Sequence, residues 1–394
     1  MISKIKIQNF KSLKTLELDC SNLNLFTGMN GMGKSSVIQS LLVLRQSLDK
    51  GYLLKNGLTL KGDLVNLGTG KDVLFQDAEK EETSFDLTFY EGDQTVKHSW
   101  IFNYQGSDGT KYADSDVIPF AEDSASPPPE GLQELPLFNS SLKYLNADRW
   151  VKNQYERSDF QVRQGRNVGK HGEFTAHFLA HFGTDKEAEV HQSLWYPATD
   201  VRTLDYQVSA WMGEISPGCY VRSEKIPGID AIKLTYEYES ESGRSNEVTP
   251  TNAGFGMTYA LPVIVQLLSA QPGDIVIIEN PEAHVHAQGQ SALGKLIART
   301  AGIGVQVFIE THSDHIINGV GVAVHQGALD HKLAKVYYFY KRPKQLASSS
   351  HIVELEVSGQ LDDRPLKKEH IDGFFDQINK DLDTILFTPI EKKA

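Results

Sequence analysis

The stretch "LNLFTGMNGMGKSSVIQSLL" (residues 23–42) decides the fold class of this 394-residue chain. It opens with an apolar run that ends at Gly28, which is typical of a buried strand. The segment after the glycines places Val37, Ile38 and Leu41 at helical spacing. Between the two lies G-x-x-x-x-G-K-S, the pattern of a phosphate-binding loop. A strand, a glycine-rich loop and a helix in this order predict a P-loop nucleotide-binding domain.

The fixed positions of this loop have chemical roles. Glycines let the backbone bend so that its N–H groups point at phosphate oxygens, and the following helix offers its positive end to the anion. Lys34 is expected to reach the β- and γ-phosphates of ATP, and the Ser35 hydroxyl to hold Mg²⁺. A glycine turn beside a surface lysine is the structural alternative. The expected ATP-binding residues are Asn30, Gly31, Gly33, Lys34, Ser35 and Ser36.

A P-loop needs an acid on another strand to complete its magnesium site. The segment "DIVIIE" (274–279) reads as a fully buried strand, and Glu279 stands at its carboxyl end, where α/β sheets place their ligands. A glutamate that only caps the strand is the alternative. A second buried strand puts Glu310, Thr311 and His312 at an equivalent edge. His312 is expected to bond the γ-phosphate or a water molecule.

Composition excludes several classes of protein. No run of about 18 apolar residues occurs, so no membrane span is expected, and the N-terminus does not resemble a signal peptide. The two cysteines, Cys20 and Cys219, are too few for a disulfide framework or a structural zinc site, which fits a cytoplasmic location. A net charge of −12 opposes general binding to nucleic acid. The basic cluster from Arg157 to His171 is either a local exception or a solvated loop.

The patterns along the chain divide it into four parts. Residues 1–104 are expected to form an N-terminal ATPase lobe with the P-loop, and residues 105–245 an insertion and linker region that begins with a surface loop at 105–136. Residues 246–350 are expected to form a C-terminal ATPase lobe, and residues 351–394 a short tail domain. Buried strands alternate with helices, which predicts a mostly parallel core sheet, and the lack of sustained heptads excludes a long coiled coil.

Five segments resemble, in their order, the ABC-type ATPases of the RecF, SMC and OLD class. They are "IKIQNFKSL", the P-loop, "TNAGFGMTYALP", "IIENPEAHVH" and "IETHSDHII". More closely, the chain resembles a bacterial group of stand-alone AAA-family ATPases of this class that carry a short C-terminal domain of unknown function. The similarity covers nearly the whole chain and is weakest across 80–140.

This resemblance implies both a fold and a mechanism. The fold is an α/β P-loop NTPase of the ABC-ATPase head type, with a mostly parallel core sheet, an antiparallel N-terminal β-lobe and a mixed insertion. The mechanism is a head-to-tail homodimer with ATP and Mg²⁺ between the P-loop of one copy and a signature loop of the other. The signature residues would be Asn252, Gly254, Gly256 and Thr258, although a simple turn and helix N-cap also fit this segment. Gln76 is the candidate for the glutamine loop.

The chain departs from the family pattern after "DIVII". The common ABC pattern has an Asp that supports Mg²⁺, a Glu that polarises the attacking water, and a Pro. Here Glu279, Asn280, Pro281 and Glu282 follow one another. The neutral amide of Asn280 can orient water but accepts no proton at neutral pH, so slow ATP turnover is expected. Glu282 or His312 is expected to substitute in part, and Glu279 to keep the metal role with Ser35.

Two histidines follow in the same loop, and three functions fit the chain as a whole. The resemblance implies that the loop with His284 and His286 is a dimer contact; a metal site is the alternative, and it has no third ligand near in sequence. The preferred function is a dimeric ATPase that regulates an effector protein such as a nuclease, which the resemblance implies for prokaryotic anti-phage defence. An OLD-like nuclease needs a Toprim site, and "LDD" (361–363) is its poor candidate. The third possibility is an SMC- or RecF-like DNA-binding ATPase. The SMC type needs a coiled-coil arm, and residues 105–245 do not supply one.

Overall fold

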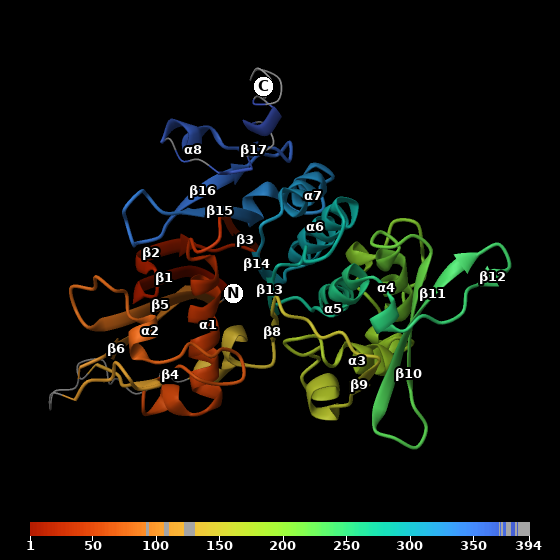
Figure 1. Cartoon of the computed structure of the whole chain (residues 1–394), viewed down its shortest axis with the longest axis horizontal. Helices are drawn as coiled ribbons and strands as arrows, with labels where there is room; N and C mark the ends of the chain where they lie inside the picture. The colour runs from red at the N-terminus through yellow and green to blue at the C-terminus, as the bar shows by residue number, and fades with distance from the viewer. Residues whose placement is uncertain are drawn as a thin grey trace, which may run out of the picture.

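The protein is described here by a computed structural model. The described residues are 1–91, 94–105, 110–121, 131–369, 371, 373–375, 380–382 and 384. A central sheet separates an antiparallel lobe, red and orange in Figure 1, from a green insertion of helices and strands. In this described part of the chain, no helix is long and apolar enough to cross a membrane.

The central sheet has seven strands in the order β17-β16-β15-β3-β14-β13-β8. Five of them run parallel, and β16 and β17 form an antiparallel edge. The bounds are β3 Leu23–Gly28, β8 Leu142–Leu145, β13 Ile275–Glu279, β14 Gln306–Glu310, β15 Ala334–Tyr340, β16 Ser349–Leu355 and β17 Leu361–Asp362. The mostly parallel core sheet predicted from the sequence is confirmed. Strand β8 comes from the stretch assigned to the insertion, yet it forms one edge of this sheet.

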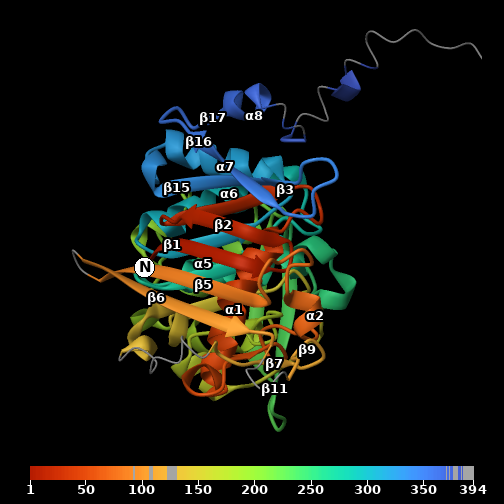
Figure 2. The same cartoon turned by 90° about the vertical axis from the view of Figure 1, so that its left-hand side faces the viewer.

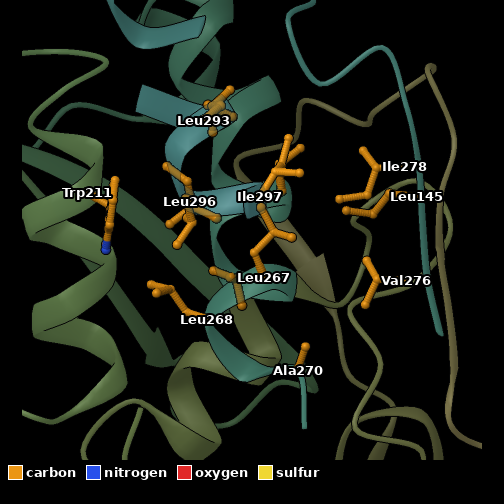
Figure 3. Close-up of a cluster of buried hydrophobic side chains, with 14 of the residues drawn as sticks. Leu145, Trp211, Leu267, Leu268, Ala270, Val276, Ile278, Leu293, Leu296 and Ile297 are labelled. Atoms are coloured by element: carbon orange, nitrogen blue, oxygen red, sulfur yellow. The ribbon is translucent and has the colours of Figure 1, made fainter. Parts of the chain in front are cut away.

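Helices and the antiparallel lobe bury both faces of the sheet, which explains its unalternating apolar strands. On β13, Ile275 and Ile277 pack into the cluster that contains the apolar face of α1, whereas Val276 and Ile278 pack into the cluster of α5, α6 and α7. Figure 3 shows the second cluster, where Val276 and Ile278 lie beside Leu145 and opposite side chains of α5 and α6. The bounds are α1 Lys34–Asp49, α5 Phe255–Ser269, α6 Ala287–Gly302 and α7 Asp314–His325.

The N-terminal lobe is a second, antiparallel sheet in the order β2-β1-β5-β6, which faces the viewer in Figure 2. Its strands are β1 Ile2–Phe10, β2 Leu13–Asp19, β5 Glu82–Glu91 and β6 Gln94–Asn103, and the short elements beside it are β4 Leu58–Thr59, α2 Gly70–Val73 and β7 Val117–Ile118. The antiparallel hairpins β1–β2 and β5–β6 confirm the antiparallel N-terminal β-lobe that was expected. The apolar residues of β1 are buried in the cluster that also holds the apolar face of α1, so this lobe packs over α1.

The insertion packs against α5 and combines short helices with a four-stranded sheet. Its elements are β9 Gln154–Glu156, α3 Thr175–Phe182, α4 Leu204–Met212, β10 Cys219–Lys225, β11 Ala231–Ser240 and β12 Gly243–Arg244, and α8 Arg364–Lys368 lies near the C-terminus. The surface loop predicted at 105–136 falls partly outside the described residues, as does part of the tail domain predicted at 351–394.

Candidate functional site

The P-loop joins β3 to the N-terminus of α1, and its geometry suits an anion. Gly33 adopts φ 97°, a left-handed conformation that favours glycine, and α1 begins at the next residue. Within the described residues, no side chain caps this helix end and no acid occupies its first turn. The free N–H groups and the positive end of the helix dipole are therefore available to phosphate oxygens.

The same loop borders a cavity of about 370 Å³. Its lining residues are Lys11, Ser12, Asn30, Gly31, Met32, Gly33, Lys34, Ser35, Ser36, Gln39, Glu310 and His312. This set contains all six residues that the sequence predicted for ATP binding. It also contains Glu310 and His312 from the end of β14, so the amine of Lys34 and the carboxylate of Glu310 line the same cavity.

Lys34 is the cation of this cavity. Its side chain is buried, and its Nζ donates to the backbone oxygens of Gly28 and Met29, both at 2.9 Å. Burial lowers the pKa of Lys34, and the charges of Glu310 and Glu282 act in the opposite direction. The amine is thus held among loop carbonyls at the point where phosphates would lie.

The acid in contact with Ser35 is Glu310. From the sequence, Glu279 was expected to be the acid that completes the magnesium site with Ser35. The Ser35 hydroxyl donates to Glu310 Oε1 at 2.8 Å. The reason is strand order, because β14 lies between β3 and β13 and brings its own carboxyl end next to the P-loop. Glu279 lies one strand further away, paired in register with Glu310, and its Oε1 accepts a bond from the Tyr144 hydroxyl at 2.9 Å.

Both acids sit in a weakly solvated environment. Burial raises the pKa of Glu310 to about 7, the Ser35 hydrogen bond opposes this, and the nearby charge of Glu279 adds to it. Burial also raises the pKa of Glu279, while the Tyr144 hydrogen bond lowers it. Two neighbouring carboxylates, one buried and one half-buried, are of the kind that a cation can bridge.

Asn280 follows β13 in an unusual backbone conformation. Its φ is 45°, which asparagine adopts more readily than most residues, and its N–H donates to the Glu310 backbone oxygen at 2.8 Å. The side-chain Oδ1 is buried and finds no hydrogen-bond partner among the described residues. A neutral amide can orient a water molecule but accepts no proton at neutral pH, and the role expected for Asn280 stays a prediction.

Arg149 clamps the backbone at the end of β13. Its guanidinium donates to the carbonyl oxygens of Glu279 at 2.6 Å and Asn280 at 3.1 Å, and its exposed fraction is only 2%. Burial lowers the pKa of Arg149 to about 10, so the side chain stays charged at neutral pH. The guanidinium lies 5.9 Å from the ring centre of Tyr259 on α5, and that ring meets His284 edge-on at 4.7 Å. Arg149 therefore links the acidic strand end to the helix that follows the expected signature loop.

Glu282 holds the histidine loop in place. Its Oε2 accepts from the Thr311 hydroxyl at 2.8 Å, and its Oε1 accepts from the His312 backbone N–H at 2.7 Å. Burial lowers the pKa of His312, and the charge of Lys34 lowers it further, so the imidazole is largely neutral at pH 7. Both oxygens of Glu282 are thus engaged by the two residues that follow β14.

The structure separates the four expected signature residues. Asn252 and Gly254 are exposed, and so is Phe255 between the glycines, with 63% of its surface accessible. Thr258, in contrast, is buried in the core with 2% exposure, so its hydroxyl cannot face a phosphate on another copy. It lies on the inner side of α5 together with Met257 and Leu261, because helical periodicity turns this position inward. The expectation for Thr258 was wrong.

Gly256 is required by packing, which a matched pair of substitutions can test. A Cβ at Gly256 would lie 2.4 Å from the His284 carbonyl oxygen, whereas at Gly254 no described atom beyond its chain neighbours lies within 4 Å. We expect Gly256→Ala to lower the free energy of unfolding by about 1–3 kcal/mol, and Gly254→Ala to change it by less than about 0.5 kcal/mol. Urea denaturation measures both, and equal stability of the two variants would contradict the close approach.

The remaining candidates lie elsewhere. Gln76 lines a separate cavity with Lys71 and Tyr104, and the glutamine that lines the P-loop cavity is Gln39, whose side chain accepts a bond from Lys11. Among the described residues, no group of three or more His, Cys, Asp and Glu side chains could hold a metal ion.

The basic cluster and the "LDD" segment are engaged in local ion pairs. Arg157 bonds Asp230 at 2.8 Å, Arg163 lies 3.8 Å from Asp159, and Asp362 bonds Arg364 at 2.6 Å. These contacts fit the solvated-loop alternative for the cluster from Arg157 to His171.

Three residues with a role in the site were missed or not assigned one. Glu310 was placed at the correct sheet edge without a function, and Tyr144 and Arg149 were assigned none. Their positions could have indicated a role in the site. Tyr144 lies in the short strand at 142–145 and Arg149 follows it, and strand ends of a parallel sheet gather at one edge.

Comparisons with known proteins agree with this geometry. Among curated proteins, none matches the chain by sequence. The solved head domain of an SMC protein bound to the C-terminal winged-helix domain of ScpA aligns with 90% of this chain and 98% of its own, with a TM-score of 0.51 and 16% identity. The SMC head from Thermotoga maritima (TM-score 0.46, 10% identity, 90% and 99% covered) and an SMC head bound to the C-terminal domain of ScpA from Pyrococcus furiosus (0.49, 14%, 94% and 99%) align more weakly.

The first of these alignments supports the ABC-type head fold that the sequence predicted. A family model, described as "AAA domain, putative AbiEii toxin, Type IV TA system", matches residues 23–318, which hold the P-loop, both acidic strand ends and His312. The chain therefore belongs to this family of AAA-domain ATPases, and its fold is the ABC-type head fold seen in an SMC protein.

Proposed function

We propose that the protein binds ATP with Mg²⁺ in the P-loop cavity, hydrolyses it slowly, and uses the bound state to control a partner protein. One observation carries this proposal: the uncapped start of α1, the amine of Lys34 and the buried acid Glu310 all meet in a single cavity. Anion-binding N–H groups, a cation and a metal-binding oxygen in one space match the needs of a nucleoside triphosphate and its metal.

Slow hydrolysis is supported by the groups around the place of the attacking water. Asn280 carries no proton-accepting group, and both oxygens of Glu282 are engaged by Thr311 and His312. His312 borders the cavity and is the remaining neutral base. Because phosphoryl transfer depends mainly on positioning and electrostatic stabilisation, turnover can continue without a strong base at a reduced rate.

The proposed control of a partner is supported by the exposed surface beside the expected signature loop. Gly254 and Phe255 are exposed there, and the ring of Phe255 lies 5.8 Å from that of His284, which follows the acidic strand end. In the proposed mechanism a second copy presents this surface to the nucleotide, and the resulting homodimer acts on an effector such as a nuclease. A role in anti-phage defence is part of the same proposal, and the family description, which names a putative toxin, supports such a setting.

Phosphate release tests the hydrolytic part of the proposal. The wild type is expected to turn over ATP well below the ~10 s⁻¹ that is typical of enzymes. His312→Ala and Glu282→Gln should each lower kcat by about tenfold with little change in KM. If Glu282 acts through His312, the double variant should be no slower than His312→Ala alone. Multiplicative losses in the double variant would show instead that Glu282 acts on its own, and Glu354→Gln, an exposed acid on β16, serves as the control.

A further inference from the structure

Glu310 is a buried acid with an unused oxygen. Only 6% of its surface is exposed, and it lines the P-loop cavity at the end of β14. Its Oε1 accepts the hydrogen bond from Ser35, but its Oε2 is buried and has no hydrogen-bond partner in the part of the chain that the structure describes. A buried carboxylate oxygen without a donor is costly, so it points to a ligand that the site is built to receive.

The chemistry around Oε2 favours a divalent cation. The nearest amine, that of Lys34, is already held by two loop carbonyls, and Glu279 stands beside Glu310 in register on the neighbouring strand. Mg²⁺ is usually held by one or two carboxylates together with substrate phosphates and water. The set formed by Glu310, Glu279 and the Ser35 hydroxyl fits this pattern, since the phosphates of ATP supply the remaining oxygens.

Glu279 and Glu310 differ in how many hydrogen bonds hold them in place. Glu279 is fixed by the Tyr144 hydroxyl on its side chain and by Arg149 on its backbone, whereas the only hydrogen bond to the Glu310 carboxylate in the described structure comes from Ser35. A hydroxyl that donates to a carboxylate can turn its lone pairs to a cation when the cation arrives. Ser35 and Glu310 can thus exchange their mutual hydrogen bond for two bonds to the same ion.

We propose that Glu310 is a direct ligand of the Mg²⁺ that accompanies ATP, next to Ser35. Glu279 acts on the ion from the neighbouring strand without being a direct ligand. This inference rests on the proposed function and adds to it a metal ligand on the strand between the P-loop strand and the strand of Glu279. It has a second consequence. Without the metal, the charge of Glu310 repels the phosphates of ATP, so the site discriminates strongly against metal-free nucleotide.

The test measures binding of a fluorescent ATP analogue in Mg²⁺ and in EDTA. For the wild type, Mg²⁺ should tighten binding by about tenfold or more. In Glu310→Gln this ratio should fall close to one while binding in EDTA stays equal or becomes tighter, because a repelling charge is gone. Glu279→Gln should keep most of the ratio, and Glu354→Gln, the exposed control on β16, should keep all of it.

Each other outcome has a defined meaning. An unchanged Mg²⁺ ratio in Glu310→Gln overturns the inference, and so does the loss of binding in both Mg²⁺ and EDTA, which would indicate a structural role. Glu310→Asp, which withdraws the carboxylate by one methylene and keeps its charge, should lower the ratio without tightening the EDTA value. If the wild type and Lys34→Ala bind the analogue equally, the proposed function itself fails, and this is distinct from a failure of Glu310 alone.

Discussion

In Lys34→Ala, the dissociation constant for Mg-ATP is expected to rise by at least about 100-fold, which corresponds to about 2.7 kcal/mol. Lys34 is the buried cation of the P-loop cavity, and its amine stands among carbonyls at the start of α1. Removing it leaves the triphosphate with the helix N-terminus and the more exposed Lys11, which is held by Gln39, while Glu310 remains as a nearby negative charge. Isothermal titration calorimetry with a non-hydrolysable ATP analogue measures the change directly.

The same variant also tests the proposed dimer. Light scattering should show that the wild type with the analogue and Mg²⁺ reaches twice its monomer mass, and that Lys34→Ala does not. Lys335→Ala, which removes a half-buried lysine of β15 outside the cavity, is the matched control and should behave as the wild type. Nucleotide-dependent dimerisation that persists in Lys34→Ala would exclude the arrangement with ATP between two copies.

Arg149→Met is expected to lower the free energy of unfolding by about 3 kcal/mol. Arg149 is buried, satisfies two backbone carbonyls at the end of β13, and offsets the nearby charges of Glu279 and Glu282. Methionine keeps the apolar stem but removes the guanidinium donor to the Glu279 carbonyl, one of the two donors to the Asn280 carbonyl, and the cation beside Glu279. Urea denaturation at neutral pH gives the change from the shift of the midpoint.

A surface arginine provides the control for this loss. Arg202 lies 5.1 Å from the ring centre of Trp195 and is largely exposed, so Arg202→Met should change stability by less than about 0.5 kcal/mol. If Arg149→Met were equally mild, the two carbonyl bonds would contribute little and the link from β13 to α5 would have no energetic basis. ATP binding measured on the folded fraction of Arg149→Met separates lost stability from a displaced acidic strand end.

Local patterns predicted the parts of this fold that depend on neighbours in the chain. The P-loop is one continuous segment, so its strand, glycines and helix could be recognised together, and all six expected ATP-binding residues line one cavity. The apolar strands that end at Glu279 and Glu310 could be identified for the same reason, because burial on both faces leaves a run of apolar residues.

The order of strands across the sheet could not be derived in this way. Nothing in the segments themselves states that β14 lies between β3 and β13, and this arrangement decides which acid meets Ser35. The Arg149 clamp joins residues that are 130 and 131 positions apart through backbone carbonyls, which leave no mark in the sequence. Thr258 shows a different limit, because a motif match named a residue that the helix turns into the core.

The left-handed backbone of Asn280 bears on how this site could change over evolutionary time. A glutamate at this position would bring a proton acceptor, but it would also meet a conformation that costs a side chain of its shape roughly 1 kcal/mol. Faster hydrolysis would then require at least one further change that relaxes the turn, and each change alone would be unfavourable or neutral. Under the proposed mechanism, a lineage with this turn would keep its slow rate until both changes occurred together.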